Sequence, residues 1–236
     1  MITSIRKFFG RTLLWLFFNI AMFAVLVGID LYDIAMPLWW NDVAPLATNM
    51  LAGGLVSFFF YWLVVYEPER RKRHLIKTNL SKMYSRIKEG ILYQIVFASQ
   101  KGGRIDLEFS LDTIDRLLTV EGFKDTFSGG REANEGFYAF ENQMMDNTRE
   151  FREIVLYLDL LARQIEFVLH NYNMDDEHLF DFFKRLELLL LRLRHSTPGY
   201  DESKPLCSFI YEIFAGWNPI EGYMGYDLID KMITDI

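Results

Sequence analysis

The strongest pattern in the sequence is a pair of long apolar runs near the N-terminus. Residues 43–66, VAPLATNMLAGGLVSFFFYWLVVY, hold no charged side chain, and as a helix rising 1.5 Å per residue they extend about 36 Å. Residues 12–29 form a second uncharged run, which extends about 27 Å as a helix. Because the hydrocarbon core of a bilayer is about 30 Å thick, the two runs predict an N-terminal two-helix transmembrane hairpin.

Beyond this hairpin the apolar positions recur every three or four residues, so we predict an all-α fold, with residues 68–236 forming an α-helical domain. The longest pattern is a heptad seam, typical of a coiled coil, which predicts one helix over 135–172. A short turn and a second helix to about His195 follow, and the two make a long antiparallel helical hairpin. The seam positions are Met144, Thr148, Phe151, Val155, Leu158, Ala162, Ile165, Leu169 and Tyr172.

Proline, serine and glycine mark the boundaries of the preceding elements. Pro68 predicts a break or kink after the second span, because proline lacks an amide hydrogen and clashes with the preceding turn. The helix after it is expected to continue to about Ser99. A short helix over 111–120 is then predicted, with Ser110 as its N-cap and Gly122 as its end signal.

The remaining elements are shorter. Residues 123–134 contain Ser-Gly-Gly and predict a loop. Asn173 or Asp175 is expected to cap the second helix of the long hairpin. A short helix is expected over 205–215, and a last amphipathic helix over 226–236.

Basic residues lie on one side of the two spans. Residues 1–11 hold three Lys or Arg, and residues 67–88 hold eight against two Glu, whereas the connection 30–42 holds three Asp and no Lys or Arg. By the positive-inside rule, both termini are expected in the cytoplasm and the connection outside. The prediction is a multi-pass protein of the cell (inner) membrane whose helical domain is cytoplasmic.

Small and polar residues recur along both spans, where they let helix backbones approach closely in lipid. They explain the packing of the two spans as a hairpin, and they also suit the assembly of several subunits into a homo-oligomer. The positions are Asn19, Ala24 and Gly28 in the first span and Asn49, Gly53 and Ser57 in the second.

A basic cluster follows the second span. Arg70, Arg71, Lys72 and Arg73 can contact anionic lipid head groups of the bilayer. The simpler interpretation is that their charges only fix the topology.

The rest of the chain is acidic. Residues 101–236 hold 14 Lys or Arg against 26 Asp or Glu, which argues against nucleic acid as a partner because phosphate contacts need a basic surface. Cys207 is the single cysteine, so no disulfide forms within the chain. It lies on an apolar face and is most simply a buried small hydrophobe.

Few residues form a pattern that carries chemistry. Glu166 and His170 are four residues apart on one helix face, and His178 follows across the turn, so a metal site is conceivable there. A solvated surface pair explains Glu166 and His170 better. Asp106 and Glu108 alternate with apolar residues and suit an exposed strand or loop face better than a magnesium site. We therefore expect no catalytic residue, cofactor or metal.

The junction FFFYWLVVYEPERRKR resembles that of small bacterial two-span membrane proteins of unknown function. The resemblance covers the second span and its exit, and it implies no activity.

The leading hypothesis is a membrane-anchored, non-enzymatic interaction or sensor module. Its acidic helical domain would bind an unidentified cytoplasmic protein or itself. One alternative is a membrane-perturbing effector of growth arrest or phage defence that acts through oligomerised spans. Another is a metal-dependent enzyme of the helical domain. The missing catalytic pattern and the heptad seam favour the first hypothesis.

Overall fold

The computed structural model describes residues 2–32, 36–37, 39–130, 132–172, 174 and 176–236, with the side chains of residues 2–13 and 41 left out. The described chain is mostly helical, as the sequence predicts, and it divides into two compact units, residues 1–74 and 75–236.

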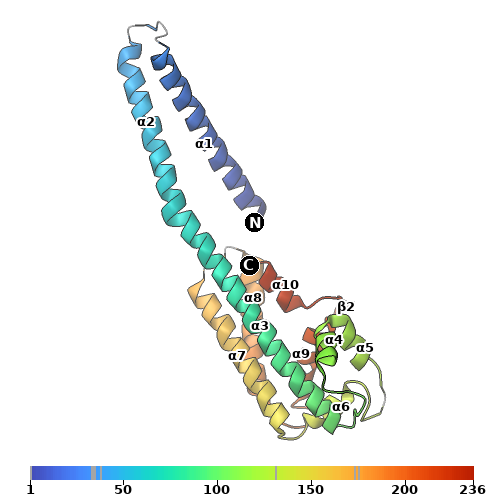
Figure 1. The fold of residues 1–236 in the computed structure, drawn as a ribbon. Helices are drawn as coiled ribbons and strands as arrows, with labels where there is room; N and C mark the ends of the chain where they lie inside the picture. Colours follow the sequence, from blue (N-terminus) through green and yellow to red (C-terminus); the bar gives the residue numbers. More distant parts are fainter. Residues whose placement is uncertain (1, 33–35, 38, 131, 173, 175) are drawn as a thin grey trace. The chain divides into compact units, whose positions relative to one another are not determined.

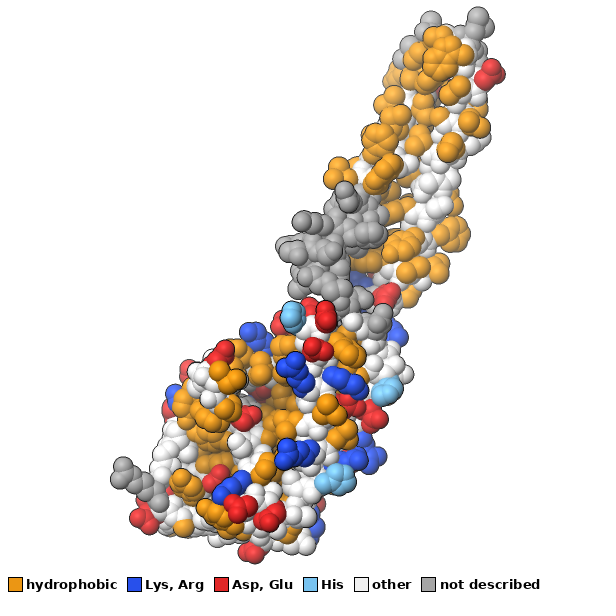
Figure 2. All heavy atoms as spheres, turned by 180° about the vertical axis from the view of Figure 1, so that it is seen from behind, with side chains coloured by type: hydrophobic (Ala, Val, Ile, Leu, Met, Phe, Trp, Pro, Cys, Tyr) orange, Lys and Arg blue, Asp and Glu red, His pale blue; other side chains and the backbone are white. Residues whose placement is uncertain are grey.

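The first unit is a pair of helices, α1 (Ile2–Leu31) and α2 (Trp40–Tyr61), that pack along each other (Figure 1). Two helical stretches are long and apolar enough to cross a membrane, one over Leu14–Leu31 and one in the helical run that begins at Asp42. Few of their side chains are buried within the protein, and apolar side chains cover much of the visible surface of this unit (Figure 2). Such a surface is costly to expose to water.

Pro68 does not end the helix that precedes it. The π-helical turn η1 (Trp62–Tyr66) follows α2, and α3 (Glu67–Lys101) begins directly after it. The amide of Glu67 donates to the carbonyl of Trp62, five residues back. The wider π turn accommodates Pro68. Proline has no amide hydrogen to donate, and in an α-helical turn its ring would clash with the carbonyl four residues earlier.

The second unit is a helical body with one very short hairpin. The part of α3 from Leu75 onward belongs to this unit. It packs closely on α7 at Gly90, because the ring of Tyr157 lies where a Cβ on residue 90 would be. The other elements are α4 (Leu111–Leu118), α5 (Val120–Phe127), α6 (Tyr138–Gln143), α7 (Arg149–Asn171), α8 (Glu177–Leu193), α9 (Lys204–Ala215), β1 (Trp217–Asn218), β2 (Gly222–Tyr223) and α10 (Leu228–Thr234).

The single helix predicted over 135–172 is wrong. α6 and α7 are separate helices, because the chain leaves the helix at 144–148 and Thr148 then caps α7, its Oγ1 accepting from the amide of Phe151 at 3.1 Å. The buried face of α7 is also rotated from the predicted seam and shares four of its positions. The shared buried positions are Phe151, Leu158, Ala162 and Ile165. Ile154, Leu161 and Val168 are buried as well, whereas the seam positions Val155 and Leu169 are only partly buried.

The end signal assigned to Gly122 is also wrong. Thr119 both ends α4 and caps α5, its Oγ1 accepting from the amide of Gly122 at 3.1 Å. Gly122 therefore lies in the first turn of a new helix, and residues 123–127 are helical where a loop was predicted. Residues 105–109 form a turn and irregular chain, not a strand.

The C-terminal elements agree better with the sequence. α8 and α9 lie where they were predicted, and Gly216 ends α9 in the left-handed conformation at φ 58°. The N-cap of α8 is Asp176, whose Oδ1 accepts from the amide of His178 at 2.9 Å. Asn173 and Asp175, the predicted caps, lie outside the described residues.

The core of the second unit is apolar and rich in phenylalanine. Phe123 of α5 packs on Phe214 of α9 with ring centroids 5.0 Å apart, and Phe137 meets Phe127 at 5.8 Å. Cys207 is buried there, as the sequence predicts, and burial raises the pKa of its thiol. This core fixes α9, and with it the C-terminal hairpin and α10, in place.

Candidate functional site

The small and polar residues predicted as a packing stripe on the second span lie outside the contact between α1 and α2. Asn49, Gly53 and Ser57 are all exposed, and a Cβ built on Gly53 would meet nothing within 4 Å. The partly buried side chains of α2, which face α1, belong to another set: Ala44, Ala47, Thr48, Leu51, Ala52, Leu55 and Phe58. The predicted stripe is therefore a free face of this unit.

In α1, Asn19 differs from the other predicted packing residues. Its Nδ2 donates to the carbonyl of Trp15 at 2.8 Å, and its Oδ1 lies 3.3 Å from where a Cβ on Gly54 would be. Ala24 is exposed, and a Cβ on Gly28 would meet nothing within 4 Å. Gly54 is thus the close-contact glycine of the hairpin, and sequence reasoning missed it although it stands next to Gly53.

The basic cluster at the start of α3 remains largely exposed. Arg70, Arg71 and Lys72 are exposed and Arg73 is partly buried. Arg71 pairs with Glu67, one helical turn earlier, at 2.9 Å. Exposed pairs of this kind are weak, so the cluster keeps a net positive charge.

One of the candidate metal residues, His170, has a local partner. His170 Nδ1 bonds the backbone carbonyl of Glu166 at 2.9 Å, one turn back on α7. No group of three His, Cys, Asp or Glu side chains suited to a metal ion occurs among the described residues. Asp106 forms an ion pair with Arg104 at 2.8 Å, and this hydrogen-bonded guanidinium lowers the pKa of its carboxyl.

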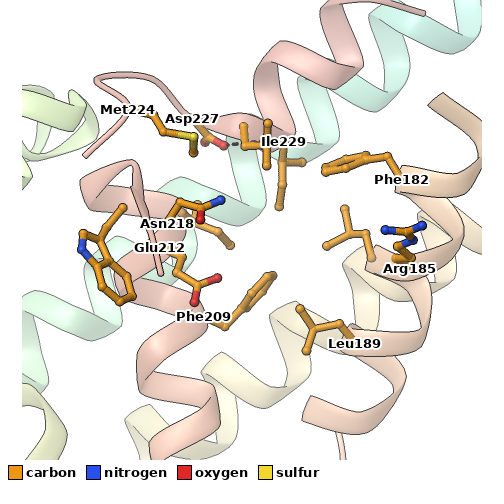
Figure 3. A pocket seen from close by; sticks show the side chains of 13 residues that line it. Phe182, Arg185, Leu189, Phe209, Glu212, Asn218, Met224, Asp227 and Ile229 are labelled. Carbon is orange, nitrogen blue, oxygen red and sulfur yellow. Dashed lines mark hydrogen bonds between the residues drawn. The ribbon is translucent and has the colours of Figure 1, made fainter. Parts of the chain in front are cut away.

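A hollow of about 280 Å³ lies between α8, α9, the β1–β2 hairpin and α10 (Figure 3). Its walls are mostly apolar, and three of its side chains carry a charge: Arg185, Glu212 and Asp227. The apolar lining includes Phe182, Leu186, Leu189, Phe209, Ile213, Trp217, Met224 and Ile229.

Asp227, at one edge of the hollow, is a buried carboxylate with four partners. Its Oδ2 accepts from the hydroxyl of Tyr84 at 2.5 Å and from the Nζ of Lys88 at 2.8 Å, both on α3. Its Oδ1 accepts from the amides of Ile229 and Asp230 and so caps α10. The network holds α10 to α3 and satisfies the charge of Asp227.

Tyr84 gives this network a pH dependence. Burial, and then the charge of Asp227, raise the pKa of its phenol above 10.0. A group whose pKa is raised by folding contributes stability that is complete below pH 10 and is lost as the pH rises through the folded-state pKa.

We therefore expect Tyr84→Phe to cost about 2 kcal/mol of unfolding free energy at neutral pH, since it removes a hydrogen bond to a charged group. The difference from wild type should shrink above pH 10, where the wild type loses this contribution and the variant does not. Chemical unfolding at pH 7, 9 and 11 measures it. A difference that stays constant over this range would contradict the raised pKa of Tyr84. The other tyrosines ionise in both proteins, so their effect on stability cancels in the comparison.

Sequence reasoning missed both the hollow and the network. Asp227 precedes an apolar helix, which is a local N-cap signal, but its partners are 139 and 143 residues away in the chain. No local pattern reports such a pairing.

Comparison with protein-family models, with curated proteins and with solved structures finds no match to this chain.

Proposed function

We propose that this protein is a membrane-anchored, non-enzymatic interaction module that assembles through its spans. α1 and α2 cross the cell membrane as a hairpin, with both termini in the cytoplasm. The second unit then lies on the cytoplasmic side, where it can bind a cytoplasmic protein or further copies of itself.

The observation that carries this proposal is the free face of α2. Asn49, Gly53 and Ser57 recur every four residues and lie outside the packing of α2 on α1. In lipid, small residues allow close approach of a second helix, and an asparagine amide gains from a partner across the interface. Self-association of hairpins places this face in such a contact.

The charge distribution supports the orientation. The exposed Arg70, Arg71 and Lys72 follow the second span, where they suit the anionic inner leaflet. The acidic residues 101–236 suit a basic protein partner and not nucleic acid.

The same free face also suits the second candidate function, an effector whose assembled spans perturb the bilayer. Polar side chains such as Asn49 on a lipid-exposed face are costly when unpaired, so assembly is favoured in either case. The two functions differ in their consequence for the cell, and overexpression separates them.

The direct test is the oligomeric state of the full chain in a mild detergent, measured by light scattering after size exclusion, together with a pull-down from the cytoplasm. An oligomer supports the proposal. A monomer that retrieves no partner would contradict it.

A further inference from the structure

The hollow between α8, α9, the hairpin and α10 has no part in span assembly. Its volume of about 280 Å³ lies just below the usual range of ligand pockets, about 300–1,000 Å³, so it suits a molecule with one ring or a short chain. Its wall combines aromatic and aliphatic side chains from four elements (Figure 3). A few charged groups in an apolar hollow determine which ligand it prefers.

Glu212 is the charged group that lacks a partner. Its side chain lies on the α9 wall beside Phe209 (Figure 3) and is half-buried. Within the part of the chain that the structure describes, its carboxylate has no hydrogen bond or ion pair. Burial alone raises its pKa, and no nearby cation lowers it.

Of the other two charges of the hollow, one is paired and the other is largely solvated. Asp227 is held by Lys88 and Tyr84. Arg185 lies on the opposite wall, on α8 (Figure 3), where its side chain is 84% exposed and its contact with Asp181, at 3.9 Å, is weak, so water screens its charge. The hollow thus offers one unmatched negative charge at an apolar surface.

We propose that this hollow binds a small organic ammonium ion. The apolar part of the ligand fills the space between Leu189, Phe209 and Ile213, and its ammonium group donates to the Glu212 carboxylate. An ammonium–carboxylate hydrogen bond in a partly desolvated site is stronger than one between neutral groups. A neutral or anionic molecule of the same shape lacks this bond.

The test uses full-length protein in nanodiscs of zwitterionic lipid and three matched probes: 2-phenylethylamine, 2-phenylethanol and 3-phenylpropionate. Calorimetric titration, corrected with empty nanodiscs, measures saturable binding of each probe. We expect the amine to bind about tenfold or more tightly than the alcohol, with the acid weakest. Equal binding of amine and alcohol, or no saturable binding of the amine, would overturn the proposal.

Two variants locate the site. Glu212→Gln keeps the shape and should reduce amine binding about tenfold while leaving the alcohol unchanged. Leu189→Trp, at a partly exposed position that tolerates a larger side chain, should weaken both probes by filling the hollow. Glu166→Gln, on the exposed face of α7, is the matched control and should change neither. Unaltered amine binding in Glu212→Gln would rule out the assigned contact.

Discussion

Replacing Asp227 with alanine is expected to cost about 3–5 kcal/mol of unfolding free energy, because it leaves a buried ammonium without its counter-ion. Lys88, whose side chain is 11% exposed, pairs with this carboxylate at 2.8 Å. The hydroxyl of Tyr84 loses its acceptor at the same time, and α10 loses its N-cap. For a folded unit of this size, such a loss lowers the melting midpoint by roughly 10 °C.

Chemical unfolding of the full chain, followed by circular dichroism, measures this loss. Asp230→Ala, an exposed neighbour on α10, is the matched control and should change stability by less than about 0.5 kcal/mol. The double variant Asp227→Ala with Lys88→Met should be more stable than the sum of the single effects, because it removes both charges. A loss below about 1 kcal/mol in Asp227→Ala, or simple additivity in the double variant, would show that the pair does not hold α10 on α3.

If the protein assembles as proposed, Gly53→Leu is expected to prevent this assembly and leave single hairpins. Gly53 lies on the free face of α2, where an added Cβ meets nothing within 4 Å, so leucine fits the isolated hairpin. In an assembled state, the same side chain separates two helix backbones that a small residue allows to meet. Light scattering in detergent should then report the mass of one chain.

The neighbouring glycine supplies the matched control. Gly54 faces Asn19, whose Oδ1 lies 3.3 Å from where its Cβ would be, so Gly54→Leu should disturb the hairpin itself and not assembly alone. Growth of cells that overexpress each protein then separates the two candidate functions. If the wild type slows growth and Gly53→Leu restores it, the protein is the membrane-perturbing effector. If neither protein slows growth, that alternative is excluded. An oligomer unchanged by Gly53→Leu would contradict assembly through this face.

Much of the helical content could be predicted because it rests on local signals. Apolar periodicity located α8. Pro205 and Gly216 located α9, because proline suits the first turn of a helix and glycine suits the left-handed residue after its end. The two span-length runs emerged from the absence of charge over 12–29 and 43–66. These features depend on neighbours in the chain and need no knowledge of tertiary contacts.

Two helix boundaries were predicted wrongly because an N-cap residue interrupts the helix where the sequence pattern did not indicate it. The seam continued across Thr148, but this side chain caps α7 and breaks the helix. In the same way, Thr119 starts α5 just before Gly122, which was taken for an end signal. A threonine hydroxyl that satisfies an orphan amide can divide an otherwise continuous pattern.

The candidate ligand site could not be predicted, because its parts converge only in three dimensions. Glu212 stands among apolar residues of α9, and nothing in its neighbourhood along the chain shows that Arg185 and Trp217 line the same hollow. The free face of α2 was predicted only in part. The sequence identified Asn49, Gly53 and Ser57, but not which glycine faces α1.

In the proposed topology, the two apolar helices hold the second unit on the cytoplasmic side of the cell membrane. Protease is added to right-side-out and to inverted membrane vesicles, and immunoblotting of the C-terminal region then reports on which side this unit lies. We expect residues 75–236 to be protected in right-side-out vesicles and digested in inverted ones. Digestion of this region in intact right-side-out vesicles would rule out this topology.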